Sequence, residues 1–390
     1  MGSYSQLTVA GYPIYSLKNT YDPLLVFLLF QKNDYVTERK KWSDRNQVVW
    51  GKEISESKGT FMFRGFRQSV KVCKERLEIA GTNLKIAKRN FRSAKKIAKS
   101  EGFYSFNITK VTFEEYLSEI ADILEKKEKF YDMLYQNFRE SLIVDDLGII
   151  GQQDVDRLYS ILSCLPEGEM IEYDLSDVIN NGWVNEDVIL QMDRERILVL
   201  TEGRTDVEFI SSALKRLYPH LVDFYHFIDF DEFKVESSAS ALVKLITAFT
   251  AAKVNHPVIA LFDNDTTGIM EMKRLQNIKL NNNVKVMRLP DIGFAKKYPT
   301  RGATGIKNMN INGLACGIEM YLGANILEKD GKLLPVLWKS YNDHEDKYQG
   351  EISDKKHVQD TFRKKIKSGE DFDLSNLDLV LKMIFSAFQN

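Results

Sequence analysis

The spacing of apolar residues changes near Arg196, and the two sides of this point predict different structures. Before it, apolar residues recur at intervals of three and four over residues 68–99 and 112–139. This spacing is the pattern of an amphipathic helix. Shorter helical patterns cover residues 153–164 and 185–194. We therefore expect a mostly helical N-terminal region in which the two long helices pack as an antiparallel pair.

Beyond Arg196, short continuous apolar runs alternate with helical patterns. The runs are ILVLTEG, FYHFIDF, PVIALFDND and VKVMRLP, and helical patterns separate them over residues 205–217, 239–252 and 266–276. Apolar strands separated by helices of this length are typical of βαβ units, which build a parallel sheet covered on both faces. The sequence therefore predicts an α/β domain with a parallel sheet in the C-terminal half.

The change of pattern also places a domain boundary. At 390 residues the chain is too long for one ordinary core. Residues 1 to about 35 alternate apolar positions with turn formers, which suggests a short hairpin packed on another part of the protein. We expect a helical domain over residues 1–193, followed by a Rossmann-like α/β domain over residues 194–390 that ends in a helical extension.

Composition indicates a globular protein. Apolar residues make up 44% and charged residues 28% of the chain. The longest apolar run near the N-terminus, residues 24–30, is far shorter than the roughly 20 residues of a membrane span. Cys73, Cys164 and Cys316 lie far apart and have no metal-ligand spacing, so we expect reduced thiols. These features favour a cytoplasmic protein that does not bind a membrane.

The net charge of −1 hides one strongly basic segment. Residues 64–99 carry twelve Lys or Arg residues against Glu75 and Glu78. Two interpretations remain open, a solvated helix face or a surface that contacts nucleic acid. The candidate nucleic-acid-binding residues are Lys71, Lys74, Lys85, Lys88, Arg89, Arg92, Lys95 and Lys96.

Two of the predicted strands end in acidic residues. ILVLTEG ends in Glu202, with Asp206 four residues later on the first turn of a predicted helix. PVIALFDND ends in Asp263 and Asp265, and Gly268 opens the next helix. Because the carboxyl ends of parallel strands form the functional crevice of such sheets, we expect these acids to converge there.

Carboxylates accept protons or bind hard cations through oxygen. Asp263 and Asp265 are two positions apart in an extended segment, so their side chains are expected on the same side, where they can hold Mg2+ or Mn2+. An Asp-x-Asp pair alone is a weak signal. Its position after an apolar run, some 60 residues beyond a strand that ends in Glu-Gly, is much more specific.

These two stretches resemble a known domain. Glu202-Gly203 with Asp206 matches an E-G-x-x-D pattern, and residues 263–268, DNDTTG, match D-x-D-x-x-G. Together they resemble the Toprim domain shared by topoisomerases, primases and the nucleases of the overcoming-lysogenization-defect family. The first pattern is the variant typical of the nucleases. The Toprim-like character covers about residues 195–370, roughly half of the chain.

A narrower resemblance extends over the whole length. The opening MGSYSQLTVAGYPIYSLKNTYDP and the later stretches YPTRGATG, INGLACGIEMYLG and YQGEI are similar to bacterial HEPN/Toprim proteins found among anti-phage defence genes. The resemblance implies a HEPN-like N-terminal domain fused to a Toprim nuclease domain. HEPN ribonucleases use an Arg and a His a few residues apart, but no histidine precedes His220 here. We therefore interpret the N-terminal domain as a degenerate HEPN domain with a binding or assembly role.

The resemblance also implies further site residues. Toprim nucleases often place another metal ligand where Glu319 stands in GIEMYL, although a surface glutamate on a helix is the alternative. Nuclease members use a lysine near the end of the domain, and Lys355 or Lys356 fits that place. Glu202 and one of these lysines are the expected catalytic groups.

The combined expectation is a metal-dependent endonuclease that acts as an anti-phage effector on DNA or RNA, tRNA included. Glu202, Asp206 and Glu319 would share one Mg2+ or Mn2+ ion and the two aspartates of DND another, roughly 4 Å away. The alternative is a catalytically silent assembly or sensor module of a defence complex. A separate ATPase or sensor subunit and a homo-oligomer are the expected partners.

Overall fold

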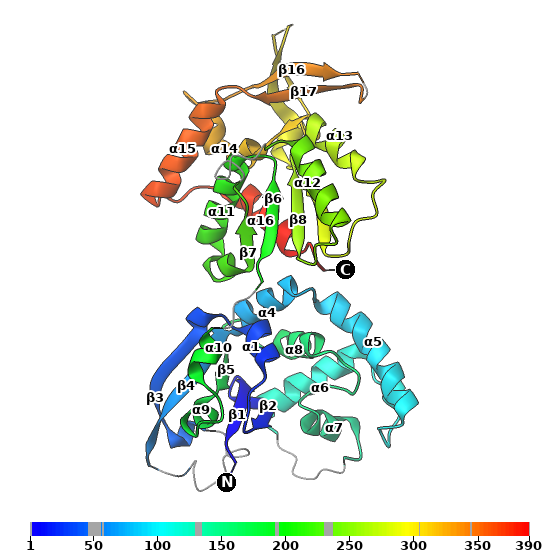
Figure 1. Cartoon of the computed structure of the whole chain (residues 1–390), viewed down its shortest axis with the longest axis vertical. Helices are drawn as coiled ribbons and strands as arrows, with labels where there is room; N and C mark the ends of the chain where they lie inside the picture. Colours follow the sequence, from blue (N-terminus) through cyan, green and yellow to red (C-terminus); the bar gives the residue numbers. More distant parts are fainter. Residues whose placement is uncertain are drawn as a thin grey trace. The chain divides into compact units, whose positions relative to one another are not determined.

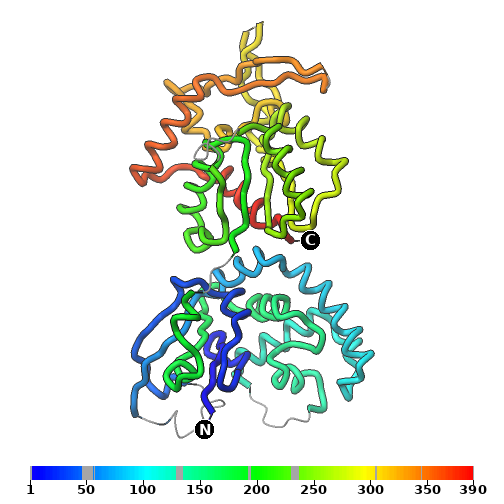
Figure 2. The backbone as a smooth tube through the Cα atoms, viewed as in Figure 1, coloured from blue at the N-terminus to red at the C-terminus, as the bar shows by residue number. Residues whose placement is uncertain are grey.

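The computed structural model describes residues 2–45, 56, 58–128, 135–191, 195–229, 237–303, 305–343 and 345–389. The chain divides into two compact units (Figures 1 and 2). The N-terminal unit contains residues 1–193 with residues 389–390, and the C-terminal unit contains residues 194–388. No helix among the described residues is long and apolar enough to cross a bilayer.

A five-stranded antiparallel sheet forms one part of the N-terminal unit. Its strands are β1 (Tyr4–Val9), β2 (Tyr12–Lys18), β3 (Tyr35–Lys41), β4 (Thr60–Ser69) and β5 (Met170–Asp174), in the order β2-β1-β5-β4-β3. Leu7, Ile171 and Phe66 face the core from three neighbouring strands. The expected N-terminal hairpin is present as β1 and β2, but it belongs to this larger sheet.

Helices supply the other part of the N-terminal core. They are α1 (Pro23–Leu29), α4 (Val70–Ile79), α5 (Leu84–Glu101), α6 (Phe113–Lys126), α7 (Phe138–Val144), α8 (Asp154–Ser163), α9 (Ser176–Asn180) and α10 (Glu186–Leu190). Short 3-10 helices cover Lys32–Asp34 (η1), Trp42–Asp44 (η2) and Ile108–Lys110 (η3). The rings of Phe91, Phe113 and Tyr116 pack together where α5 meets α6, with Phe91 stacked on Tyr116.

The predicted single helix over residues 68–99 is wrong. Strand β4 continues to Ser69, and the helical part is split into α4 and α5. Gly81 has φ +100°, a left-handed conformation that ends α4, and the Asn83 side chain accepts the Ile86 N–H to begin α5. The local turn chemistry of Gly81 and Asn83 therefore overrides the apolar periodicity that runs through both helices.

The predicted helix over residues 112–139 is also divided. Helix α6 begins at a capping box in which Thr112 and Glu115 bond to each other's backbone, and it ends at Lys127 with φ 49°. Residues 129–134 lie outside the described residues. The prediction of a mostly helical N-terminal domain missed β3, β4 and β5, because the alternating charges of strands such as YVTERKK carry little apolar signal.

The C-terminal unit contains the predicted parallel sheet. Its strands are β6 (Ile197–Thr201), β7 (Tyr225–Phe227), β8 (Val258–Phe262) and β10 (Val284–Arg288), in the order β10-β8-β6-β7. All three strand pairs are parallel. Every residue of β8, VIALF, is buried, which is the pattern of a central strand covered on both faces.

Helices cover both faces of this sheet (Figure 1). The helices of the unit are α11 (Arg204–Leu217), α12 (Ala239–Ala251), α13 (Thr266–Arg274), α14 (Ala324–Leu327), α15 (Lys355–Ser368) and α16 (Ser375–Phe385), with 3-10 helices at Pro219–Phe224 (η4), Phe294–Lys297 (η5) and Ile318–Tyr321 (η6). Helices α12 and α13 contact β8 on one face, where Leu242 and Ile246 pack with Ala260 and Phe262. Helices α11 and α16 contact each other.

A second sheet follows the parallel one. It contains β11 (Tyr298–Gly302), β12 (Gly305–Met309), β16 (Val336–Asn342) and β17 (Lys347–Ile352), in the order β12-β11-β16-β17. Two short antiparallel strand pairs complete the unit. They join β9 (Asn264–Asp265) to β13 (Ala315–Cys316) and β14 (Glu328–Lys329) to β15 (Lys332–Leu333). The pairing of β9 with β13 holds the segment before Glu319 against the DND stretch.

Candidate active site at the strand ends

The two acidic strand ends lie side by side. Strands β6 and β8 are parallel neighbours, and Thr201 pairs with Leu261 at the end of their shared register. The backbone N–H of Asp263 donates to Oε1 of Glu202 at 2.8 Å. Acids that are 61 positions apart in the sequence therefore share one edge of the sheet, because parallel strands end together there.

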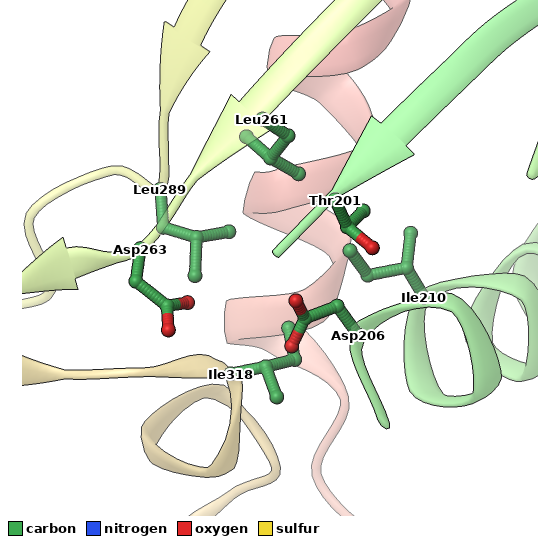
Figure 3. A pocket seen from close by; sticks show the side chains of 7 residues that line it. All are labelled: Thr201, Asp206, Ile210, Leu261, Asp263, Leu289 and Ile318. Carbon is green, nitrogen blue, oxygen red and sulfur yellow. The ribbon is translucent and has the colours of Figure 1, made fainter. Parts of the chain in front are cut away.

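Asp206 lies opposite Asp263 across a small pocket. It is 8% exposed on the first turn of α11, and its Oδ2 accepts the Gly203 N–H at 2.9 Å. The pocket is lined by Thr201, Asp206, Ile210, Leu261, Asp263, Leu289 and Ile318. Figure 3 shows the carboxylates of Asp206 and Asp263 entering it from opposite sides. Apolar walls therefore surround two acids.

Glu319 joins the same group. It is 3% exposed on η6, so the interpretation of Glu319 as a surface glutamate on a helix is wrong. Oδ2 of Asp263 and Oε2 of Glu319 lie 3.3 Å and 3.4 Å from the position that a Cβ atom of Gly317 would occupy. The two carboxylates are therefore close neighbours, and a glycine at 317 leaves the space between them open.

One lysine forms an ion pair with Glu319. Nζ of Lys355 lies 3.2 Å from Oε1 of Glu319, which also accepts a hydrogen bond from Nε2 of Gln359 at 2.8 Å. Lys355 is the first residue of α15, and Lys356 follows it as an exposed residue on the same turn. The contact with Glu319 therefore distinguishes Lys355 from Lys356.

Asp265 plays a different structural part from Asp263. Its Oδ1 accepts the Gly268 N–H at 2.7 Å and caps α13, and its Oδ2 accepts a hydrogen bond from Nε2 of Gln349 at 2.6 Å. Both carboxylate oxygens are therefore engaged within the chain. Asp265 fixes the start of α13 and links it to β17.

Asn264, between the two aspartates, was not a predicted site residue. It is fully buried, and its Oδ1 accepts hydrogen bonds from Arg288 at 2.7 Å and from the Gly313 N–H at 2.9 Å. Its Nδ2 donates to Asp291 at 3.0 Å. Asn264 therefore ties the DND stretch to the end of β10 and to the backbone just before β13. The only sequence signal for this role was its place inside DND.

Gly268 allows the acids to approach the backbone. A Cβ atom at this position would lie 2.6 Å from the carbonyl oxygen of Asp263 and 2.9 Å from Oε1 of Glu202. Both distances are shorter than van der Waals contact. The glycine of D-x-D-x-x-G is thus required by the close packing of α13 on the two strand ends.

The acids strongly perturb one another's protonation. Burial raises the pKa of Glu202 to about 8 and that of Asp206 to about 7, and charges of neighbouring acids add to both shifts. Burial and the charges of Asp206 and Glu202 also raise the pKa of Asp263 well above its usual range. Burial acts to lower the pKa of Lys355, but the charge and hydrogen bond of Glu319 raise it. The cluster is therefore short of positive charge.

The donor atoms fit hard cations. All of the acids present oxygen, which is the ligand type that Mg2+ and Mn2+ prefer, and added positive charge would offset their repulsion. Across the described ranges, no three His, Cys, Asp or Glu side chains converge closely enough to hold one metal ion. Because Mg2+ usually keeps several waters and takes only one or two carboxylates, pairs among Glu202, Asp206, Asp263 and Glu319 would be enough to bind it.

The predicted nucleic-acid-binding residues fall into two groups. Lys88 pairs with Glu114, and Lys95 donates to the backbone carbonyl of Thr109 at 3.2 Å.

The exposed basic residues of α5 are Lys85, Arg89, Arg92, Lys96 and Lys99, spaced four, three, four and three apart along one helix face. Lys71 is exposed on α4, and Lys74 lies over the Tyr159 ring. We call the exposed set on α5 the basic stripe.

Comparison with known proteins identifies the N-terminal half. The family model described as HEPN/Toprim N-terminal domain 1 matches residues 1–196, half of the 390-residue chain. No curated protein and no solved structure matches the chain. The chain therefore belongs to the HEPN/Toprim N-terminal domain 1 family.

Proposed function

We propose that this protein is a divalent-metal-dependent endonuclease with a Toprim-like C-terminal unit. The observation that carries the proposal is the grouping of Glu202, Asp206, Asp263 and Glu319 at the end of a parallel sheet, with Lys355 beside them. HEPN and Toprim domains are typically associated with nucleases, which agrees with the family match. Acids of this kind, buried among apolar walls, favour phosphodiester hydrolysis over a purely structural role.

The proposal gives each residue a part. The four grouped carboxylates hold Mg2+ or Mn2+, and Asp265 positions them by capping α13. Bound divalent ions supply the charge that makes a water nucleophilic and that offsets the charge on the leaving oxygen. The ammonium of Lys355, drawn toward the cluster by Glu319, neutralises charge on the scissile phosphate.

The substrate in this proposal is DNA or RNA, tRNA included. The metal-binding acids contact only phosphate, which both nucleic acids share, so they do not select between the two. The basic stripe on α5 supplies phosphate contacts. We further propose a role as an anti-phage effector, on the resemblance to HEPN/Toprim defence proteins, in which a separate ATPase or sensor subunit controls a homo-oligomer of this chain.

A cleavage assay tests the proposal. Purified protein is incubated with labelled DNA, RNA and tRNA in Mg2+, Mn2+ or EDTA. We expect cleavage that EDTA abolishes and that Glu202→Gln and Asp263→Asn each reduce on the order of a hundredfold or more. The matched control is Asp223→Asn, because Asp223 is a half-exposed carboxylate that pairs with Arg196 away from the cluster. Equal losses in all three variants would contradict the assignment.

The alternative function is a catalytically silent assembly or sensor module. It is favoured by one observation, that no three potential metal ligands among the described residues already surround a common point. A silent module predicts no cleavage of any substrate with either metal, also after addition of candidate partner subunits. It further predicts that Asp263→Asn leaves partner binding unchanged.

A further inference from the structure

The second sheet of the C-terminal unit carries a row of aromatic side chains on its outer part. Tyr341 and Tyr348 are 45% and 52% exposed, and Trp338 is half-buried beside them. The ring centroid of Tyr348 lies 5.6 Å from that of Trp338 and 5.0 Å from that of Tyr341. We call these three residues the aromatic row. Trp338 and Tyr341 lie on β16 and Tyr348 lies on β17; Figure 1 labels both strands.

The exposure of these rings is unusual for their strands. The inner ends of the same two strands are buried, at Val336 and Ile352, so this sheet does pack against the unit where packing is available. Cross-strand ring pairs also stabilise a hairpin. The two tyrosines keep about half of their surface in water and Trp338 is partly exposed beside them, so together they form a surface suited to a flat, apolar partner.

The hairpin itself carries four acidic residues, Asp343, Glu345, Asp346 and Glu351, against Lys339 and Lys347, so the charge that favours an anionic partner lies on the neighbouring part of the sheet. Residues 292–318, which include β11 and β12, contain four basic residues and no acidic residue. On strand pairing, Lys307 faces the same side of the sheet as Val336 and Trp338. Two of the acidic residues near the row are engaged within the chain, since Glu345 pairs with Lys273 and Asp346 accepts a hydrogen bond from Tyr341.

Strand β17 connects the aromatic row to the acidic cluster. The backbone carbonyl of Tyr348 accepts a hydrogen bond from Oγ1 of Thr266 at 2.7 Å. The next residue, Gln349, donates to Asp265 at 2.6 Å and accepts the Thr267 N–H at 3.0 Å. A few residues further on, α15 begins at Lys355 beside Glu319. A polymer lying on the row would therefore approach the proposed site.

We propose that the aromatic row is a docking surface for single-stranded nucleic acid, whose unpaired bases stack on Tyr348, Tyr341 and Trp338. Exposed rings accept the face of any base, but bases inside a duplex are already stacked and paired. The inference rests on the proposed nuclease function for what happens to the strand once it is bound. It adds a substrate class, strands or loops with unpaired bases, that the metal-binding acids do not define.

Binding without cleavage tests this inference. Fluorescence anisotropy in EDTA compares a labelled single strand with a duplex of the same sequence. We expect Tyr348→Ala and Tyr341→Ala each to weaken single-strand binding by on the order of tenfold and to change duplex binding much less. Tyr348→Phe keeps the ring and should retain binding. Leu379→Ala is the matched control, because Leu379 is an exposed apolar residue on α16.

The outcomes separate this inference from the proposed function. Unchanged single-strand affinity in the two alanine variants, with melting temperatures equal to that of the parent protein, overturns the docking surface. A parent protein that binds no single strand also overturns it. If no substrate is cleaved under any condition but the alanine variants still lose single-strand binding, the nuclease proposal fails and the docking surface stands.

Discussion

The absence of a side chain at Gly268 allows the close contacts within the acidic cluster. In Gly268→Ala the new methyl group would lie 2.6 Å from the Asp263 carbonyl oxygen and 2.9 Å from Oε1 of Glu202. The first contact is with a backbone atom, which cannot move away by a side-chain rotation. We expect a loss of about 1–3 kcal/mol in the free energy of unfolding and a larger loss of cleavage, measured by chemical denaturation and by the nuclease assay.

Gly293→Ala is the matched control for this prediction. Gly293 has φ −62° and a Cβ atom there would meet nothing within 4 Å. The same change of residue should therefore leave both stability and cleavage close to those of the parent protein. Similar losses in the two variants would mean that the close approach at Gly268 is unimportant.

The raised pKa values of the acids predict how stability depends on pH without metal. Burial raises the pKa of Glu202 to about 8 and that of Asp206 to about 7, above the values of about 4 expected in the unfolded chain. The folded state then holds protons that the unfolded state releases. This contribution to stability is present below about pH 4 and is lost as pH rises through about 7 to 8.

The measurement is the melting temperature in EDTA between about pH 6 and pH 9, which we expect to fall as pH rises. Added Mg2+ or Mn2+ should reduce the fall, because bound cations stabilise the ionised carboxylates. The double variant Glu202→Gln, Asp263→Asn should show a weaker dependence on pH than the parent protein. A melting temperature in EDTA that rises over this range would contradict the prediction.

At the residue scale, sequence patterns found the acids but not the groups that orient them. Glu202 and Asp263 were predicted from strand ends, and the structure places them in contact. Gln349 and Gln359 were not predicted, because each bonds to an acid 84 or 40 positions away. An amide on a strand or helix has no pattern that marks it, so only the fold reveals its partner.

Within a single helix, the basic stripe of α5 predicts a contribution to nucleic-acid binding. Helix α5 buries Phe91 and Ala94 and exposes Lys85, Arg92 and Lys96. The triple variant Lys85→Ala, Arg92→Ala, Lys96→Ala should weaken nucleic-acid binding at low salt. Each lost phosphate contact should reduce the slope of log affinity against log salt by about 0.9 for a duplex.

The control for the stripe is a triple alanine variant of three exposed lysines of the C-terminal unit, Lys244, Lys279 and Lys364. It removes the same number of positive charges from the chain, so it corrects for net charge. Anisotropy titrations at several salt concentrations measure both variants. Equal slopes in the two would show that binding follows net charge and that the stripe has no special part.

Helices and strands with a strong apolar pattern are predicted correctly from the sequence, and strands with a weak one are missed. The four parallel strands and the helices between them were found because a short continuous apolar run such as VIALF is typical of a buried strand. In the N-terminal unit, β3 pairs with β4 through Thr37, Glu38 and Arg39, whose side chains carry no apolar alternation. Cross-strand ion pairs, including that of Arg67 with Glu38, contribute to this pairing, and the sequence does not display them.

The two units differ in what they contribute to the proposed activity. All the grouped acids and Lys355 belong to the C-terminal unit, residues 194–388, whereas the basic stripe belongs to the N-terminal unit. Each unit has a buried core of its own. If the C-terminal unit carries out cleavage and the N-terminal unit binds phosphates, removing the N-terminal unit should lower the substrate affinity more than the cleavage rate at saturating substrate.

A fragment containing residues 195–388 tests this division. We expect it to unfold cooperatively on its own, because α12 and α13 already cover one face of its sheet. At saturating substrate its cleavage rate should approach that of the full chain, while its affinity and its salt dependence should both decrease, because the fragment lacks α5. A fragment that binds as tightly as the full chain would remove α5 from the nucleic-acid interface. A folded fragment that binds its substrate but does not cleave it would instead mean that the N-terminal unit is needed to complete the catalytic site.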